Sequence, residues 1–87
     1  MGRARIERPR KLAKKLLKIR QMLGLSQNGM IASLGMADSL TQAEISAFEL
    51  GKRVPPLVLL LRYARAANIH VDDLVDDAID LSKDKIG

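Results

Sequence analysis

The chain has 87 residues, a formal net charge of +5 and no cysteine, so it holds one small domain and cannot form disulfides or thiolate metal sites. Apolar residues make up 47% of it, yet it has one Phe, one Tyr and no Trp, so the core must be aliphatic. No apolar run approaches the length of a membrane span, and the basic N-terminus lacks the apolar core of a signal peptide. These features favour a protein of a reducing cytoplasm.

The charges are unevenly distributed along the chain. Residues 1–20 carry nine Lys or Arg and one Glu, whereas residues 54–87 carry four basic and six acidic residues. This pattern suggests one side that faces a polyanion and one that is turned away, although it can also serve solubility alone. Lysines on the first helix, Lys11, Lys14 and Lys15, either contact phosphate or face water.

The first two expected helices follow a basic arm. Residues 1–8 show no periodicity and are predicted to be flexible. Pro9 suits the first turn of a helix, apolar residues then repeat with a helical period, and Gly24 ends it. Ser26 can cap a second helix, which Gly35 stops. The expected core positions of these two helices are Leu12, Leu16, Ile19, Leu23, Met30, Ile31 and Leu34.

A third, short helix has the clearest boundary signals. Thr41 and Glu44 form a capping box, in which each side chain accepts a hydrogen bond from the other residue's backbone amide. Gly51 can adopt the left-handed conformation that closes the helix. Because so short a helix is unstable alone, Ile45 and Phe48 are expected to dock it on the core.

The outward positions of this third helix are small or amide-bearing, namely Gln42, Ala43, Ser46 and Ala47. Such a face fits a DNA major groove, where glutamine can read adenine and alanine can touch the methyl group of thymine. The alternative is an ordinary solvent-exposed helix surface.

Two further helices complete the expected fold. Pro55 and Pro56 begin the fourth, which runs to about Ala67 with Asn68 as a left-handed cap. The fifth starts at about Val71, after a surface or capping His70. Its aspartates are expected to face water, since ligands on one helix face do not converge on a cation. The expected core positions are Leu57, Leu60, Leu61, Ala64, Val71, Leu74, Val75, Ala78 and Ile79.

Some apolar residues exceed what one small core needs, and these are Val58, Leu59, Ile79 and Leu81. We expect them to form the surface of a homodimer, because small domains gain stability by pairing. The alternative is extra packing between the last two helices.

Several segments together resemble the Cro/phage-repressor (XRE) helix-turn-helix family over roughly residues 10–76. They are Gly24-Leu25-Ser26-Gln27, Leu34-Gly35, Ile45-Ser46 and Glu49-Leu50-Gly51-Lys52-Arg53-Val54-Pro55. The resemblance implies an all-α, five-helix lambda-repressor-like domain over residues 9–81, between the arm at 1–8 and a polar tail at 82–87. Its second helix would cross the DNA backbone, and its third would enter the major groove.

The resemblance also implies roles for individual residues. Gln42, Ala43, Ser46 and Ala47 would read bases. Gln27, Lys52 and Arg53 would bind phosphates. Arg20 and Glu49 would form a structural ion pair. Arg3, Arg5 and Arg8 of the arm are candidates for contacts with a neighbouring minor groove.

Three features depart from the family pattern. The link from Gly35 to Thr41 is about four residues longer than the usual tight turn. Asn28 and Gly29 replace helix-favouring residues, and Ile31 stands where a small Ala usually lets the helices approach. Together these differences put the angle between the second and third helices in question.

We therefore expect sequence-specific binding of double-stranded DNA by a small transcriptional repressor or regulator, which acts as a dimer on a two-fold operator at the nucleoid. No cofactor or metal is expected, and no arrangement of catalytic residues suggests an enzyme. One alternative is an antitoxin-type regulator that binds a toxin partner. Others are a protein-interaction module that has lost DNA binding, or a binder of RNA or membrane surfaces through the arm.

Overall fold

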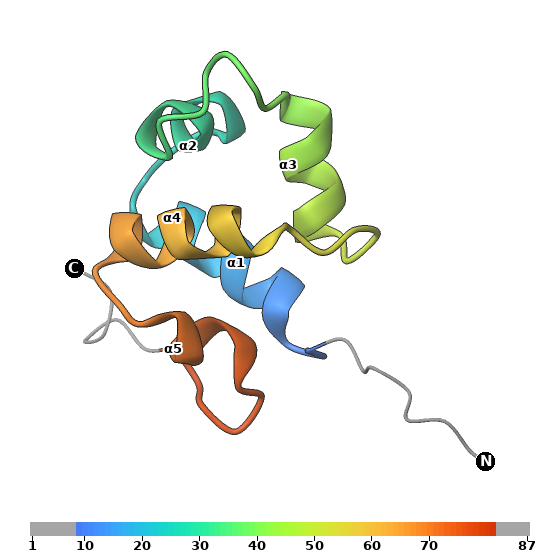
Figure 1. Cartoon of the computed structure of the whole chain (residues 1–87), viewed down its shortest axis with the longest axis vertical. Helices are drawn as coiled ribbons and strands as arrows, with labels where there is room; N and C mark the ends of the chain where they lie inside the picture. The colour runs from blue at the N-terminus through green and yellow to red at the C-terminus, as the bar shows by residue number, and fades with distance from the viewer. Residues whose placement is uncertain (1–8, 82–87) are drawn as a thin grey trace.

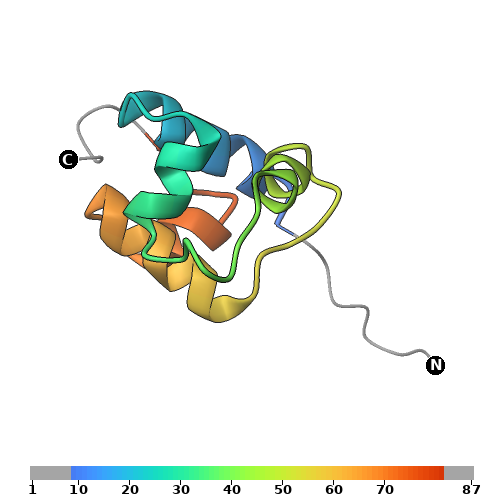
Figure 2. The ribbon, with the colours of Figure 1, turned by 90° about the horizontal axis from the view of Figure 1, so that it is seen from above.

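The computed structural model describes residues 9–81, and within them all regular structure is helical. The elements are α1 (Leu12–Met22), α2 (Gln27–Ser33), α3 (Gln42–Glu49), α4 (Leu57–Ala67) and α5 (Val71–Val75). α2 and α3 lie at one end of the long axis and α5 at the other, with α1 and α4 between them (Figure 1). Figure 2 views the molecule from the α2–α3 end. The expected all-α, five-helix fold is confirmed. The predicted arm and tail lie outside the described residues.

The core is aliphatic, as the composition requires, and the two aromatic side chains lie inside it. Phe48 brings α3 onto the core, and Tyr63 does the same for α4. Each of the five helices contributes to one cluster of buried residues. Its members are Leu12, Leu16, Ile19, Met30, Ile31, Leu34, Leu40, Ile45, Phe48, Leu59, Leu60, Tyr63, Ala64, Ala67, Leu74 and Leu81.

The long link between α2 and α3 is anchored by its own side chains. Leu34 and Leu40 at its two ends are buried, and Met36 packs against the core between them. The carbonyl of Met36 accepts hydrogen bonds from the amides of Ser39 and Leu40, both at 3.0 Å. The extra residues therefore form an ordered turn that is held at both ends.

The buried stripe of α4 differs in part from the predicted one. Leu57 and Leu61, which were expected in the core, are 72% and 38% exposed. Leu59 is buried instead, and it lies one helical turn before Tyr63. Because Leu59, Leu60 and Leu61 are consecutive, the helical period is satisfied whether Leu59 or Leu61 faces the core. The spacing of apolar residues therefore could not predict which of the two is buried.

The predicted dimer surface is wrong at two positions. Leu59 and Leu81 are 3% and 4% exposed and belong to the core of the monomer. Ile79 is half-buried, whereas Val58 is 63% exposed. The apparent excess of apolar residues disappears because Leu59 lies on the buried side of α4 and Leu81, beyond α5, packs into the core.

The fifth helix is shorter than its apolar spacing predicted. It ends at Val75, and Asp76 adopts an extended conformation instead of continuing the helix. The amide of Ala78 then donates to the Asp76 carboxylate at 2.9 Å, which stabilises a turn. The chain from Asp76 onward runs back along α1, and tertiary contacts with α1 outweigh the local helical pattern.

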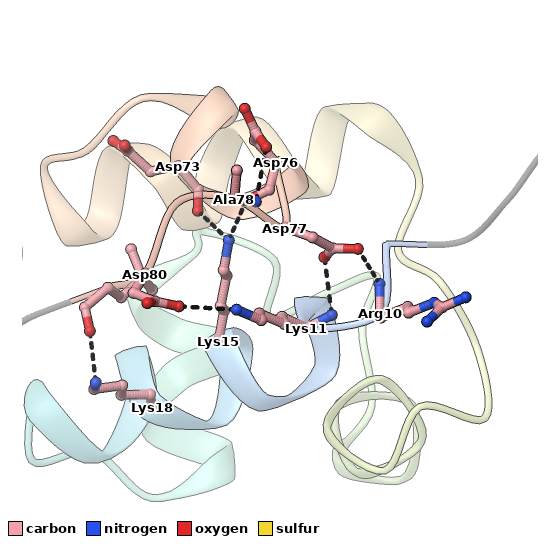
Figure 3. A network of polar contacts seen from close by, with 10 residues as sticks. Arg10, Lys11, Lys15, Lys18, Asp73, Asp76, Asp77, Ala78 and Asp80 are labelled. Atoms are coloured by element: carbon pink, nitrogen blue, oxygen red, sulfur yellow. Dashed lines mark hydrogen bonds and ion pairs between the residues drawn. The ribbon is translucent and has the colours of Figure 1, made fainter.

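We call these contacts between α1 and residues 73–81 the α1–α5 network (Figure 3). The carboxylate of Asp77 accepts hydrogen bonds from the amides of Arg10 at 2.9 Å and Lys11 at 3.0 Å. It therefore caps the N-terminus of α1, for which Lys11 provides no side-chain cap. These two backbone hydrogen bonds, helped by nearby lysines, lower the pKa of Asp77.

Two lysines of α1 and the lysine that precedes it complete the network. The ammonium of Lys15 donates to the carbonyls of Asp73 at 2.7 Å and Asp76 at 2.8 Å, and Lys15 is only 5% exposed. Lys11 pairs with Asp80 at 3.1 Å, which lowers the pKa of that carboxyl group. Lys18 donates to the carbonyl of Leu81. Burial lowers the pKa of Lys15, although the neighbouring aspartates oppose this effect.

This network corrects two expectations about charge. Within residues 9–81, the basic start of α1 and the acidic residues 73–80 do not lie on opposite sides, because they pack directly against each other. The aspartates of this region are not simply a solvated face, since Asp77 and Asp80 bind α1. Within residues 9–81, no three His, Asp or Glu side chains gather as metal ligands would.

Candidate nucleic-acid interface

The start of α3 is fixed by the predicted capping box. The hydroxyl of Thr41 accepts a hydrogen bond from the amide of Glu44 at 3.2 Å. The Glu44 carboxylate accepts in return from the amide of Thr41 at 3.1 Å. Leu40 and Ile45, on either side of this cap, are both buried. Glu44 is thus used in holding the helix, as expected.

The end of α3 is closed by a left-handed glycine. Gly51 has φ +76°, which a side chain at this position would strain. Its amide donates to the carbonyl of Phe48 at 3.2 Å, and the amide of Lys52 donates to that of Ala47 at 2.9 Å. This pair of bonds is a Schellman motif. The turn carries the chain away from the helix axis and leaves Lys52 and Arg53 exposed beside it.

The outward face of α3 agrees with the sequence interpretation. Gln42 and Ala43 are exposed, and Ser46 and Ala47 are half-buried, whereas Ile45 and Phe48 are buried. The four positions expected to face bases therefore lie on the side of α3 away from the core, and they are most open at the start of the helix.

An ion pair lies beneath this face. Arg20 of α1 donates to Glu49 of α3 through Nε at 2.7 Å and through Nη2 at 3.0 Å. The side chain of Glu49 is 5% exposed and that of Arg20 18%, so the pair is largely shielded from water. The hydrogen bonds to Glu49 raise the pKa of Arg20. The expected structural ion pair between these residues is present.

The ion pair continues to the surface through two glutamines, which the sequence did not connect. Gln27 donates through Nε2 to Oε1 of Glu49 at 3.2 Å. Gln42 donates through Nε2 to Oε1 of Gln27 at 3.1 Å. We call these four side chains, Arg20, Glu49, Gln27 and Gln42, the interface network. The only sequence signal for it was a glutamine at the first position of both α2 and α3.

The two cations after α3 differ in their surroundings. Arg53 lies 3.6 Å from Glu44 and stacks over the ring of Phe48, with 5.7 Å from its guanidinium carbon to the ring centroid. Its side chain remains 58% exposed, so it is steadied by the protein and still open to a ligand. Lys52 is exposed on the adjoining turn.

Other predicted contacts fall elsewhere. Lys11 and Lys15 bind residues 73–80 in the α1–α5 network. Lys14 is exposed on α1. Arg3, Arg5 and Arg8 lie outside the described residues. In residues 9–81, no helix has the length and apolar character that a membrane span requires.

Comparison with known families agrees with this geometry. A helix-turn-helix family model matches residues 16–74, which include the whole of α2, α3 and α4. No curated protein and no solved structure matches the chain. The matched family is one of DNA-binding regulatory domains and not of enzymes. The chain therefore belongs to the Cro/C1-type (XRE) helix-turn-helix family, and its fold is that of a DNA-binding domain.

Proposed function

We propose that the protein is a sequence-specific transcriptional repressor that binds a two-fold operator as a homodimer. The observation that carries the proposal is α3 itself. It is a short helix capped at both ends, with Gln42 and Ala43 exposed on its outer face and two cations beside its C-terminal end. A helix held in this way can enter a major groove without losing its shape.

We assign contacts with the DNA bases to the exposed start of α3. A glutamine amide pairs with the N6 and N7 edge of adenine, and a methyl side chain packs on the methyl group of thymine. Gln42 and Ala43 supply these two groups, with Ser46 and Ala47 further along the groove. Specificity should come mainly from Gln42, since one well-placed bidentate contact contributes about 1–3 kcal/mol.

We assign contacts with the DNA backbone to the turn after α3. Lys52 and Arg53 would contact phosphates, and both are exposed. Gln27 is proposed in a different role from the one its motif suggested, because both ends of its amide already have protein partners. It supports Gln42, and any contact that it makes with phosphate is secondary.

The second copy of the chain would dock on the apolar start of α4. Leu57 and Val58 are 72% and 63% exposed, and Leu61 on the same helix is 38% exposed. Leu50 and Val54, which flank the phosphate-binding turn, are 65% and 40% exposed. A two-fold axis near these residues would place two α3 helices on the same side of a duplex, as a symmetric operator requires.

The dimer has a direct test in solution. Sedimentation of the purified chain should show a concentration-dependent dimer, and Val58→Glu should shift it to monomer while the circular dichroism stays helical. A monomer at all concentrations, or an unchanged dimer in the variant, contradicts this surface. A small protein that copurifies and is lost in Val58→Glu would support the toxin-binding alternative instead.

Selection of preferred duplexes from a random-site pool tests DNA recognition. The wild-type chain should enrich a symmetric site, and Gln42→Ala should relax the preference at one base pair in each half-site. If no site exceeds bulk DNA in affinity, the chain is an interaction module that has kept the fold alone. We propose that the protein acts in the cytoplasm at the nucleoid, because its target is there.

A further inference from the structure

We propose that a hollow between the end of α2 and the second half of α4 is a docking site for an acidic segment of another protein. The hollow has a volume of about 350 Å³, and its lining consists of Ser33, Leu34, Arg62, Arg65 and Ala66. We call it the arginine hollow. None of its residues is assigned above to DNA or to the second copy of the chain, so the inference goes beyond the proposed function and does not depend on it.

The arginine hollow carries two positive charges and no negative one. Arg62 and Arg65 are both exposed, and no lining residue is acidic. Among the residues that the structure describes, neither arginine forms an ion pair. By contrast, the exposed cations Lys11 and Arg53 each lie within 4 Å of a carboxylate. The charges of the hollow are therefore open to an anion from outside the chain.

The guanidinium of Arg62 is held in place by the end of α2. Its Nη1 donates a hydrogen bond to the carbonyl oxygen of Leu34 at 2.9 Å. Gly35 leaves room for this contact, since a Cβ atom on Gly35 would lie 3.0 Å from the same nitrogen. The contact covers a carbonyl at the negative end of α2, which would otherwise repel an anion, and it leaves the other N–H groups of Arg62 for a ligand.

A carboxylate-rich chain is the ligand that this geometry fits. A guanidinium binds a carboxylate through two parallel N–H···O hydrogen bonds, and arginine is enriched at protein–protein interfaces. Arg62 and Arg65 are three positions apart on a helix, which puts their Cβ atoms about 5–6 Å from each other. Acidic side chains three or four positions apart on a partner helix have the same spacing. The hydroxyl group of Ser33, at the end of α2, adds a further donor.

The hollow is too open to enclose a small molecule. Ser33, Arg62 and Arg65 are all exposed, whereas a site for a small ligand usually covers most of the ligand's surface. A segment of a larger partner does not need this enclosure, because the partner can also contact the surface around the hollow. This reasoning favours a protein partner over a free anion.

The arginine hollow is separate from the two surfaces proposed above. Ser33 is the last residue of α2 and Gln27 is the first, so about 9 Å of helix lies between the hollow and the residue that supports Gln42. On α4, Arg65 comes about 10 Å after Val58, which is assigned to the dimer. A partner can therefore dock here while the DNA face and the dimer surface are both in use.

The experiment is a titration of the full chain with a short peptide of glutamates, capped at both ends and followed by NMR. It is run on the free chain and on the chain saturated with duplex DNA, which covers the cations of the DNA face. A glutamine peptide of the same length is the control. The backbone amides of Ser33 and Gly35 and the side-chain Nε–H groups of Arg62 and Arg65 should shift with the glutamate peptide in both titrations, and not with the glutamine peptide.

Two variants test whether geometry or charge alone is responsible. Arg65→Lys keeps the charge but loses the paired hydrogen bonds, and it breaks no contact seen within residues 9–81, so the fold should be unaffected. It should weaken binding of the glutamate peptide by about fivefold, the effect of losing one well-formed exposed pair. Lys14→Ala removes an exposed lysine that does not line the hollow and should leave the affinity unchanged.

Equal affinities for Arg65→Lys and wild type, or an equal loss in Lys14→Ala, overturn the inference, because binding would then follow charge alone. Peptide shifts that appear at Lys52 and Arg53 and vanish when duplex is added also overturn it. So do shifts of Ser33 and Arg65 that grow with protein concentration before any peptide is added, since the occupant would then be a second copy. The titration of the free chain gives its answer even if the chain prefers no duplex sequence, so failure of the proposed function is seen separately.

Discussion

The interface network and the α1–α5 network are built from similar long polar side chains, but they end differently. The interface network runs from a shielded ion pair to an exposed amide at the start of α3. The α1–α5 network ends on the protein itself, where Lys15 and Lys18 donate to backbone carbonyls and Asp77 accepts from backbone amides. The first leaves hydrogen-bonding groups open to a ligand, and the second uses its groups to join two ends of the chain.

This difference shows why a lysine-rich helix is not by itself a DNA-binding surface. α1 and its N-cap residue carry more lysines than the whole α2–α3 region, yet three of these lysines, Lys11, Lys15 and Lys18, bind residues 73–81. The α2–α3 face has few charges of its own. The proposal that this face binds DNA rests on the shape of α3 and on its exposed hydrogen-bonding groups. Lys52 and Arg53 lie at the border of the face.

The largest expected effect comes from breaking the ion pair of the interface network. Arg20→Ala leaves Glu49 shielded and without its cation, so the free energy of unfolding should fall by about 3–5 kcal/mol. Urea denaturation measures this directly. The double variant Arg20→Met/Glu49→Leu should recover much of the loss, and a double variant as unstable as the single one would contradict this account.

A smaller effect is expected at the buried lysine of the α1–α5 network. Lys15→Ala removes the donor for two carbonyls near the end of α5, and the free energy of unfolding should fall by about 1–3 kcal/mol. DNA affinity below the unfolding transition should not change. The exposed Lys14→Ala is the matched control and should be neutral in both assays. A loss of affinity in Lys15→Ala alone would extend the DNA contact to α1.

The next prediction concerns the salt dependence of binding. Lys52→Ala should reduce the slope of log affinity against log salt by about one, since one phosphate contact and its released counterion are lost. The effect should be similar for all duplex sequences. Lys14→Ala should leave the slope unchanged, and equal slopes for Lys52→Ala and wild type would remove Lys52 from the interface.

The smallest effect is a pH dependence at Asp77. Its pKa lies below the ordinary 3.8, so the folded state binds this proton less readily than the unfolded state. The stabilisation is fully present above the ordinary pKa and is lost as the pH falls through the lowered one. Asp77→Asn should therefore show a flatter fall in melting temperature below about pH 4 than wild type. Parallel curves would show that Asp77 does not cap α1 in solution.

Local signals predicted the helix-turn-helix region well. The capping box at Thr41, the glycine closure at Gly51 and the left-handed Asn68 all depend on residues close together in sequence, and all are confirmed. The buried sides of α1, α2 and α3 were also correct, because each has a single apolar stripe. These features fix where α3 starts, where it ends and which side faces out.

Long-range contacts explain what could not be predicted. Asp77 and Lys11 are 66 positions apart, and no local pattern shows that a carboxylate near the end of the chain caps α1. The end of α5 at Val75 and the burial of Leu81 likewise occur where residues 73–81 pack against α1. The choice of Leu59 over Leu57 depends on how α4 packs against its neighbours, and the link between Gln27 and Gln42 depends on how α2 and α3 meet.

The most direct test of the DNA-binding face is an amide chemical-shift map during titration with the selected duplex. Backbone amides of residues 26–28 and 41–53, and the side-chain amide of Gln42, should shift most. Those of residues 73–81 should stay within the range caused by salt. Shifts concentrated on α1 and residues 73–81, with Gln42 unmoved, would contradict the assignment of DNA binding to α2 and α3.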